Sequence, residues 1–308
     1  MDQFNPLITV IVIFRNAGAT LRETLSSLQN APTAQVEYLL VDDHSTDGGP
    51  ILASDFIRHN PHNSRLIALP PGSTGTAAAT HAAFLAARGK YVMRCDADDC
   101  LPSYALTHLA DIARNTDADV IAGPITYQYR EYGHPLREKT VPVRSLDLND
   151  MPIDTAHFSL ANKLIRRELI TTHNLYPIPG IDRWEDLGIV ARALALAGTT
   201  AITDKPIYHY IRRTGQNTLS ATDPQAVLRD HIAMARALQQ WFSQHHLADK
   251  FEPFLLRLKF IAKVKLLRHR PRRLRLWQST FPEVNPRILT LTGIPLRYRL
   301  LFALASHL

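Results

Sequence analysis

The sequence predicts an α/β protein in which a mainly parallel, Rossmann-like sheet is flanked by helices and followed by a helical extension. Short β-branched segments alternate with helical patterns in the N-terminal part of the chain. Acidic clusters directly follow two of these segments, and the last part of the chain is strongly basic. Alternation of this kind favours right-handed crossovers and parallel strands. We therefore expect a catalytic domain over residues 1–220 and a basic helical extension over residues 221–308.

The strands expected in the first domain are short and apolar. Leu7–Phe14 (LITVIVIF) is rich in β-branched residues, as in strands buried on both faces. After it, Leu21, Leu25 and Leu28 recur at helical spacing. The alternation continues with strands expected over 36–41, 65–69 and 90–95 and helices over 51–57 and 76–87.

The second half of the chain is less regular. A strand is expected over 119–123, an exposed hairpin or loop over 127–144, and a strand leading into a helix over 162–173. Leu187, Val190, Ala191 and Leu194 share one face of a further helix. The remaining helical patterns cover 226–245 and 251–270.

The composition indicates a globular protein of a reducing compartment. Apolar residues make up 45% of the 308 residues, enough for a large core. Cys95 and Cys100 are the only cysteines, which argues against a disulfide framework. The run Leu7–Phe14 is too short for a signal peptide or a membrane span, and no apolar stretch reaches about 18 residues. We expect a cytoplasmic protein, soluble or peripheral on the inner face of the cell membrane.

Two acidic clusters follow expected strands. Asp42 and Asp43 end the second strand, and Asp96-Ala97-Asp98-Asp99 follows the fourth. Acids at such positions often serve only as helix caps or turn residues. However, three carboxylates within four residues repel one another unless a cation neutralises them. Ligands of open α/β sheets bind at the carboxyl ends of strands, and hard divalent cations prefer oxygen ligands. The pattern therefore predicts a metal–diphosphate site.

A third cluster, Trp184-Glu185-Asp186, stands just before a helix. By itself it is more typical of a cap, because acids at a helix N-terminus complement the helix dipole. Together with the two strand-end clusters, it becomes a candidate for acid–base chemistry.

Six segments, in this order, resemble glycosyltransferase family 2. Residues 6–16 (PLITVIVIFRN) are similar to its opening strand, and residues 39–48 (LLVDDHSTDG) to its VDDGSTD segment. The stretch 75–99 resembles an element that begins G-x-x-x-A-R-N and ends D-A-D-D. Residues 162–169 (NKLIRREL), the pair Glu185-Asp186 and residues 208–220 resemble three further elements. The resemblance covers residues 6–220.

The resemblance implies a GT-A fold and an inverting transfer of sugar from a nucleoside-diphosphate sugar, expected to be a UDP-sugar. In that family Asp43 would bind the nucleobase, Asp96 would lie near the ribose, and Asp98 with Asp96 would hold Mn²⁺ or Mg²⁺. Asp186 would act as the general base, and Glu185 would position the acceptor or support the site. The nucleotide-sugar-binding residues expected on this basis are Phe14, Asn16, Asp42, Asp43, Gly75, His81, Asp96, Asp98, Arg212 and Arg213.

The sequence departs from the family pattern at two positions. Arg15 stands where a tyrosine is usual, and Thr80-His81 replaces the usual Arg-Asn. That arginine commonly lies near the nucleotide phosphates, so another cation would have to replace it. His81, Arg15, Arg212 and Arg213 are the candidates.

The acceptor is expected to be a glycan or lipid-linked hydroxyl in cell-surface polysaccharide, lipopolysaccharide or glycolipid assembly. Its contacts are expected between Tyr127 and Ile181. A nucleotidyltransferase is one alternative, although Phe14–Gly18 is not the Gly-rich basic loop which that class would need. A catalytically inactive module that binds nucleotide sugars is the other.

The charge of the chain is uneven. Residues 253–308 hold 12 Lys and Arg against one acid, Glu283, which gives +11 and leaves −4 for the rest of a chain whose total is +7. Basic and apolar residues alternate over 253–277, as in segments that bind anionic membranes. A docked helix pair with a solvated basic face explains the pattern equally well. No nucleic-acid-binding motif is present, and the oligomeric state is left open.

Overall fold

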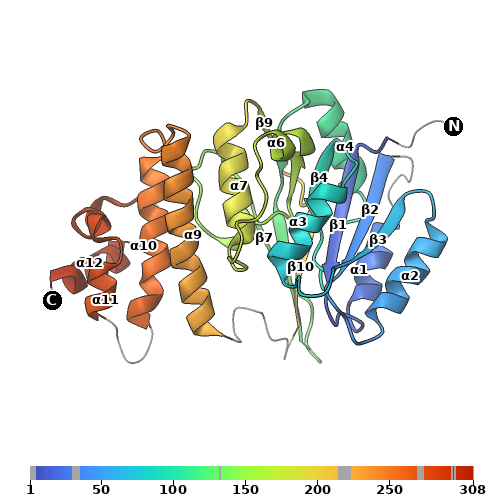
Figure 1. Ribbon diagram of the computed structural model, residues 1–308, viewed down its shortest axis with the longest axis horizontal. Coiled ribbons are helices and arrows are strands. Elements are labelled where there is room, and N and C mark those ends of the chain that lie inside the picture. The colour runs from blue at the N-terminus through green and yellow to red at the C-terminus, as the bar shows by residue number, and fades with distance from the viewer. Residues whose placement is uncertain are drawn as a thin grey trace.

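The computed structural model describes residues 5–29, 35–131, 133–213, 223–268, 274–292, 294 and 296–307. Its centre is a seven-stranded sheet with the order β3-β2-β1-β4-β8-β5-β9 (Figure 1). Strands β3, β2, β1 and β4 run parallel, as do β5 and β9, whereas β8 is antiparallel to both of its neighbours. The strands are β1 (Ile8–Phe14), β2 (Val36–Asp42), β3 (Ser64–Ala68), β4 (Tyr91–Arg94), β5 (Val120–Ala122), β8 (Lys163–Arg166) and β9 (Thr200–Ile202). The mainly parallel α/β sheet is confirmed.

Helices cover both faces of this sheet because β1 and β2 are apolar on both sides. Ile8, Val10 and Val12 pack on one face with α1 (Leu21–Leu28), α2 (Gly49–His59) and α4 (Ala105–Thr116). Ile11 points to the other face. That face packs with α3 (Thr76–Ala86), α6 (Arg167–Thr172) and α7 (Glu185–Leu196). Helix α4 was not expected from the sequence.

A smaller sheet, with the order β10-β6-β7, lies beside the large one. Strands β6 (Ile125–Arg130) and β7 (Arg137–Val141) form the expected hairpin, and β10 (Tyr208–Arg213) adds to β6 in parallel. The short helix α5 (Thr155–Phe158) follows this hairpin in the sequence. Strand β10 places Tyr208 and Ile211 over the loop after β4, where they contact Asp99.

The C-terminal extension is helical, as expected, and shares the main core. It comprises α9 (Pro224–Gln244), α10 (Glu252–Arg268), α11 (Leu274–Ser279), the 3₁₀ segment η2 (Pro282–Thr290) and α12 (Leu296–His307). Helix α9 lies beside α7, with α10 on its outer side (Figure 1). One apolar cluster runs from Ile11 in β1 to Phe302 in α12. The hydrophobic core is therefore continuous across residue 220.

Three basic side chains of α10 point into the protein. Arg257 donates to the Leu148 carbonyl at 2.6 Å, and Lys259 pairs with Glu283 at 2.8 Å. Lys263 is fully buried and donates to Asn285 Oδ1 at 2.6 Å, with its ammonium 4.1 Å from the centre of the Trp277 ring. Part of the basic segment therefore packs the extension together. Arg270, Arg272 and Arg273 lie outside the described residues. Within the described ranges, we find no helix with the length and apolarity needed to span a bilayer.

Candidate active site

The ends of β1, β2 and β4 place the sequence clusters at one edge of the sheet. Phe14 is paired with Asp42 in the register of β1 and β2, and Ile11 is paired with Arg94 in that of β1 and β4. The Asp43 N–H donates to the Phe14 carbonyl at 2.9 Å. Since parallel strands end at the same edge, the acidic loops after β2 and β4 emerge side by side.

The loop after β2 is held by Asn16 and by its own acids. Asn16 has a left-handed backbone, with φ of 51°, and its side-chain oxygen accepts from the Thr46 N–H at 2.8 Å. Asp42 Oδ1 accepts from the Ser45 N–H at 2.9 Å. Phe14 is buried, and its ring lies against Gly49 at the start of α2. Asn16, Asp42 and Phe14 thus shape the expected nucleotide site.

Asp43 joins the first acidic loop to the start of α3. Its Oδ1 accepts from Thr74 Oγ1 at 2.8 Å, and its Oδ2 accepts from the Gly75 N–H at 3.1 Å. Arg15 lies 3.6 Å from Asp43 Oδ2 and donates to Thr74 Oγ1 at 2.9 Å. Gly75 has φ of 96°, and a Cβ atom there would come within 2.7 Å of Asp182 Oδ1. Among the candidate cations, Arg15 is the one that contacts this part of the site.

The Asp96–Asp99 loop is fastened to β10. Asp99 is buried and accepts from the Tyr208 hydroxyl at 2.8 Å and from the Ile211 N–H at 2.7 Å. Burial, together with the charges of Asp96 and Asp98, raises the pKa of Asp99 to about 8. Arg213 donates to the backbone carbonyl of Asp98 at 2.6 Å. Asp99 therefore holds the loop against β10. Asp96 and Asp98 are half-buried and are the acids of this loop with accessible surface.

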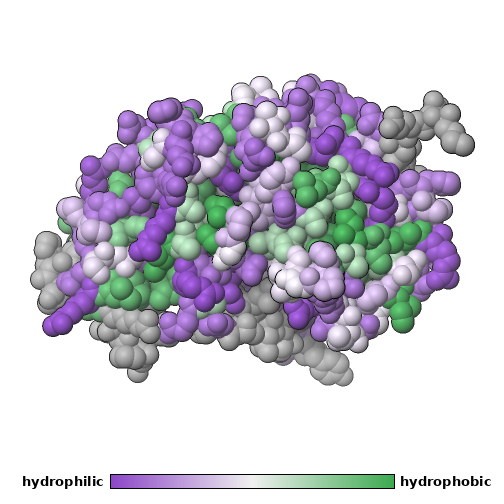
Figure 2. Space-filling model, in the orientation of Figure 1, coloured by the Kyte–Doolittle hydropathy of each residue, from purple (hydrophilic) through white to green (hydrophobic). Residues whose placement is uncertain are grey.

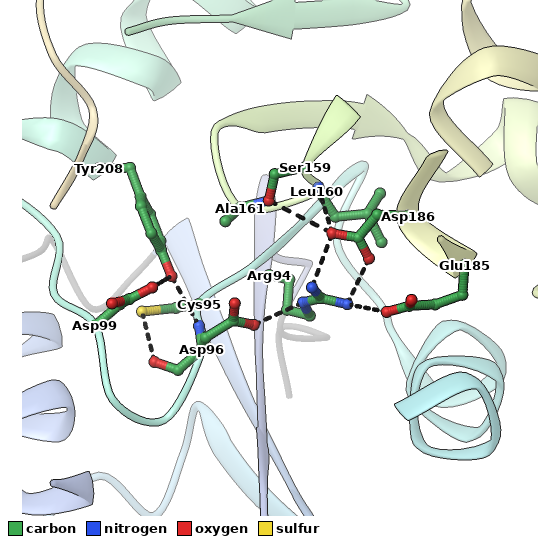
Figure 3. Close-up of polar contacts among 10 residues, drawn as sticks. All are labelled: Arg94, Cys95, Asp96, Asp99, Ser159, Leu160, Ala161, Glu185, Asp186 and Tyr208. Atoms are coloured by element: carbon green, nitrogen blue, oxygen red, sulfur yellow. Dashed lines mark hydrogen bonds and ion pairs between the residues drawn. The ribbon is translucent and has the colours of Figure 1, made fainter. Parts of the chain in front are cut away.

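The side chain of Arg94, at the end of β4, brings two acidic clusters together (Figure 3). Its Nη1 and Nη2 atoms lie 2.6 and 2.8 Å from the two carboxylate oxygens of Asp186, and Nη1 is also 2.8 Å from Glu185 Oε1. Its Nε lies 2.8 Å from Asp96 Oδ1. Burial alone would lower the pKa of Arg94, but the three carboxylates raise it well above its usual value. This role of Arg94 was not predicted from the sequence, although a buried strand that ends in arginine before several acids was a usable signal.

Asp186 is held on its other side by the segment before β8. Asp186 Oδ2 accepts from the Leu160 N–H at 3.1 Å and from Ser159 Oγ at 3.4 Å. Lys163 is fully buried behind this segment and donates to the Ser159 carbonyl at 3.0 Å and to Asn162 Oδ1 at 2.9 Å. Burial lowers the pKa of Lys163 to about 7, although the charge of Asp186 opposes that shift. None of these contacts was predicted individually.

Glu185 and Asp186 stand in different surroundings. Burial raises the pKa of Glu185, and the neighbouring charge of Asp186 raises it further. The Asp186 side chain is 15% exposed and that of Glu185 is 8% exposed. Arg94 opposes this shift in the pKa of Glu185, and Asp186 is the more exposed acid of the pair.

A pocket of about 260 Å³ opens in front of this pair. It is lined by Arg94, Ile153, Asp154, Thr155, Phe158, Ser159, Trp184, Glu185, Asp186 and Leu187. Six of these ten residues are polar or charged and four are aromatic or aliphatic, so the pocket combines convergent polar groups with some apolar surface. His157 is buried and pairs at 2.7 Å with Asp154, which lines the pocket.

Two predicted phosphate-binding residues contact aromatic rings. His81 is exposed on α3 and packs against Tyr176 with ring centres 4.9 Å apart. Arg212 lies about 5.7–5.8 Å from the rings of Tyr127, Tyr129 and Tyr210. Of the segment 208–220 matched in the sequence, residues 214–220 lie outside the described residues.

The acids at the end of β4 fit a divalent cation that shares its ligands with a diphosphate. In the part of the chain that the structure describes, no three His, Cys, Asp or Glu side chains gather as a complete metal site. Asp98 and Asp96 instead offer hard carboxylate oxygens, and Mg²⁺-type sites in nucleotide enzymes commonly use one or two carboxylates plus phosphate oxygens. The donor set thus fits such an ion.

Comparison with known proteins gives the family. The family model described as glycosyl transferase family 2 matches residues 9–173, more than half of the chain. The chain belongs to glycosyltransferase family 2. Glu185, Asp186 and the C-terminal helices lie beyond the matched residues, and Arg94, Ser159 and Leu160 of the matched core contact this pair.

Several bacterial relatives cover a large part of this family 2 chain. EpsH of Bacillus subtilis is 25% identical over 219 residues, which are 67% of this chain and 60% of EpsH. Glycosyltransferase GlyG of Streptococcus pneumoniae is 25% identical over 68% of this chain and 72% of its own length. The minor teichoic acid biosynthesis protein GgaA of B. subtilis is 24% identical over 69% of this chain and 49% of its own length. The chain therefore spans about half to three quarters of these relatives.

Solved structures show the fold of this family 2 member to be GT-A. S. aureus TarS 1–349 in complex with UDP-GlcNAc superposes with a TM-score of 0.65 and 21% identity, over 97% of this chain and 89% of TarS 1–349. The likeness includes the C-terminal helices, because it spans nearly the whole chain. The recognition of the family from six sequence segments is confirmed.

Proposed function

We propose that this chain is an inverting glycosyltransferase that moves a sugar from a UDP-sugar to a hydroxyl of a cell-surface polysaccharide, lipopolysaccharide or glycolipid. The observation that carries the proposal is the arrangement around Arg94, which joins the Asp96 loop to the Glu185–Asp186 pair. Donor and acceptor groups would meet across this arginine. Inversion needs one carboxylate opposite the leaving group, and Asp186, at the pocket, supplies it.

The donor would bind on the side of β1, β2 and the Asp96 loop. Asp43 would accept from the nucleobase, supported by Asn16, Phe14 and Gly75, and Arg15 would place positive charge nearby. Asp98 with Asp96 would hold Mn²⁺ or Mg²⁺, which would neutralise charge on the leaving diphosphate. PcManGT of Pyrobaculum calidifontis, solved with GDP-Man and Mn²⁺, has the same fold at a TM-score of 0.50 and 18% identity. We assign hexosyl or N-acetylhexosaminyl transfer as the reaction type, since TarS was solved with UDP-GlcNAc.

Asp186 would take the proton from the acceptor hydroxyl during attack on the anomeric carbon. Its carboxylate lies at the pocket and accepts from Leu160 N–H, which orients it. The exposure of the two acids supports this choice, because Asp186 is 15% exposed at the pocket whereas Glu185 is 8% exposed. Phe158 and Trp184 offer apolar surface to a sugar ring in the same pocket.

A membrane contact is the second part of the proposal. The strongly basic segment 253–277 favours an anionic membrane surface, on the inner face of the cell membrane, as partner. Because Arg257, Lys259 and Lys263 point inward, the contact would include α12, where Leu296, Leu300 and Leu304 are 57%, 50% and 69% exposed. These leucines recur every four residues and therefore share one side of the helix. Figure 2 shows apolar surface near α11 and α12 at the lower left.

The donor is tested with a panel of UDP-glucose, UDP-galactose, UDP-N-acetylglucosamine and GDP-mannose, each with and without Mn²⁺. Binding and release of the nucleoside diphosphate are measured in parallel. We expect one UDP-sugar to bind and to be turned over only when Mn²⁺ is present. Binding without any turnover in the presence of acceptor glycans would instead support an inactive module, and binding of none of the sugars would refute the proposal.

A further inference from the structure

Trp184, immediately before the Glu185–Asp186 pair, has an unfavourable backbone conformation. Its φ and ψ angles are 70° and 16°, in the left-handed region. A bulky aromatic residue adopts this region only when its surroundings enforce it, and such residues concentrate at functional sites. Because Trp184 is the cap residue of α7, its conformation sets the direction in which the first turn of α7 presents Glu185 and Asp186.

Helix α9 of the C-terminal extension holds this conformation. The imidazole of His231 stacks on the Trp184 indole with ring centres 3.6 Å apart and an angle of 10° between the planes. The preceding residue in α9, Asp230, is 2% exposed. Its Oδ2 atom accepts from the backbone N–H of Arg183 at 3.3 Å and from Arg183 Nη1 at 3.4 Å. Two adjacent residues of α9 thus fasten the two residues that precede Glu185.

A third contact fixes α9 against the first turns of α7. Gly188 faces the fully buried side chain of Met234, so that an added Cβ atom would come within 2.8 Å of its sulfur. Met234 lies one helical turn after Asp230 and His231 on α9. The contacts of α9 therefore flank the acidic pair on both sides, at residues 183–184 and at 188. Figure 1 shows the two helices running side by side.

We propose that His231 and Asp230 are positioning residues for Asp186, so that α9 is part of the catalytic unit although it lies outside the residues matched by the family model. The inference rests on the proposed role of Asp186 as base. Displacement of a catalytic group by about 1 Å can cost on the order of 100-fold in rate. Loss of the stack would let Trp184 leave its strained conformation and change the direction of Asp186. Donor binding, on the far side of Arg94, would be unaffected.

The test compares His231→Ala with His231→Phe and with a matched control on the same helix. His245 directly follows the last residue of α9 and is exposed. Its ring stacks on that of Trp241, four residues earlier, with ring centres 4.0 Å apart. His245→Ala removes a second histidine–tryptophan stack without touching the pocket. With the donor that gives the highest turnover in the panel, we expect kcat to fall about 10- to 100-fold in His231→Ala. We expect unchanged donor affinity, restoration of most activity in His231→Phe, and wild-type kcat in His245→Ala.

Asp230→Asn provides a second route if His231→Ala fails to fold, since it weakens the hold on Arg183 and keeps the stack. Asp230→Asn should also lower kcat, as His231→Ala does. Equal kcat in wild type, His231→Ala and Asp230→Asn would overturn the inference, as would a loss in donor affinity with kcat intact. Asp186→Asn is assayed alongside. If it too keeps full activity, the base assignment has failed; if it alone is inactive, only the positioning role has failed.

Discussion

Arg94 and Asp186 form a bidentate ion pair, in which Nη1 and Nη2 of the guanidinium donate to Oδ1 and Oδ2 of the carboxylate at 2.6 and 2.8 Å, respectively. Such pairs are among the strongest hydrogen-bonded contacts in proteins. The same arginine contacts Glu185 and Asp96, so one cation offsets three acids that come from two separated segments. The ion pair therefore fixes Asp186, the proposed base, and the Asp96 loop relative to each other.

Replacing Arg94 by glutamine should destabilise the fold strongly. The change leaves three carboxylates without their shared cation in a site where Arg94 is 8% exposed. Removal of one partner of a buried ion pair costs about 3–5 kcal/mol. Urea unfolding measures the free energy, with Arg137→Gln as control because its pair with Glu131 is exposed. The free energy of unfolding of this control should fall by less than about 1 kcal/mol. Equal losses in the two variants would show that the cluster around Arg94 is not a buried ion-pair network.

Lys163 should give the stability a pH dependence of known sign. Burial lowers its pKa to about 7 in the folded protein, whereas an unfolded lysine titrates near about 10.4. Between these values the unfolded chain binds the extra proton, so the contribution of Lys163 to the free energy of unfolding rises with pH. Relative to Lys163→Met, the wild type should gain about 2 kcal/mol between pH 7.5 and 9.5.

The measurement is urea unfolding at several pH values, with Lys250→Met as control at an exposed position. That control should follow the wild-type pH profile. A difference between wild type and Lys163→Met that stays constant with pH would mean that Lys163 remains charged in the folded protein.

The sequence was informative about the sheet because its strands are consecutive apolar runs. The strands that end at Phe14, Asp42 and Arg94 were expected within one residue of their ends. Helix α4 was missed, although its buried Leu106 and Leu109 have the i, i+3 spacing of an amphipathic helix, which was a usable signal. Strand β9 has only three residues, too few for a period to be visible.

The candidate site was predictable where neighbouring residues carry the signal. The acids at 42–43, 96–99 and 185–186 were identified because each cluster is local in sequence. Contacts between segments that are distant in sequence could not be predicted in this way. Arg94 contacts Asp186, 92 residues away, and Tyr208 contacts Asp99, 109 residues away. Burial, which only the fold supplies, separates the structural Asp99 from the more accessible Asp98.

Asp98→Asn should abolish metal-dependent donor binding and leave the fold intact. The exchange removes a hard anionic oxygen that the cation would use, while it keeps the size of the side chain. Calorimetric titration of UDP with and without Mn²⁺ measures the effect, and Asp111→Asn on the exposed side of α4 is the control. Undiminished Mn²⁺-dependent binding in Asp98→Asn, or full wild-type turnover in excess EDTA, would exclude this metal site.

The membrane contact should depend on the exposed leucines of α12. Leu300→Glu with Leu304→Glu should reduce binding to vesicles that contain phosphatidylglycerol, because it places acids on an apolar side of a basic extension. Binding of the wild type should fall as salt is added. Ile51→Glu, at a 68% exposed position on α2, is the matched control. If the wild type ignores these vesicles at low salt, the extension serves only to pack the fold.

The most direct measurement for sugar transfer at this site is the paired assay of donor affinity and kcat in Asp186→Asn and Glu185→Gln. With Asp186 as base, Asp186→Asn should keep donor affinity and lower kcat by about two to four orders of magnitude. Glu185→Gln should keep most of kcat and raise the acceptor KM, because glutamine keeps the size of the side chain and can still hydrogen-bond to the acceptor. An inactive Glu185→Gln beside an active Asp186→Asn would reverse the two roles. Full activity in both variants would contradict the account, because the pair would then be only the cap of α7.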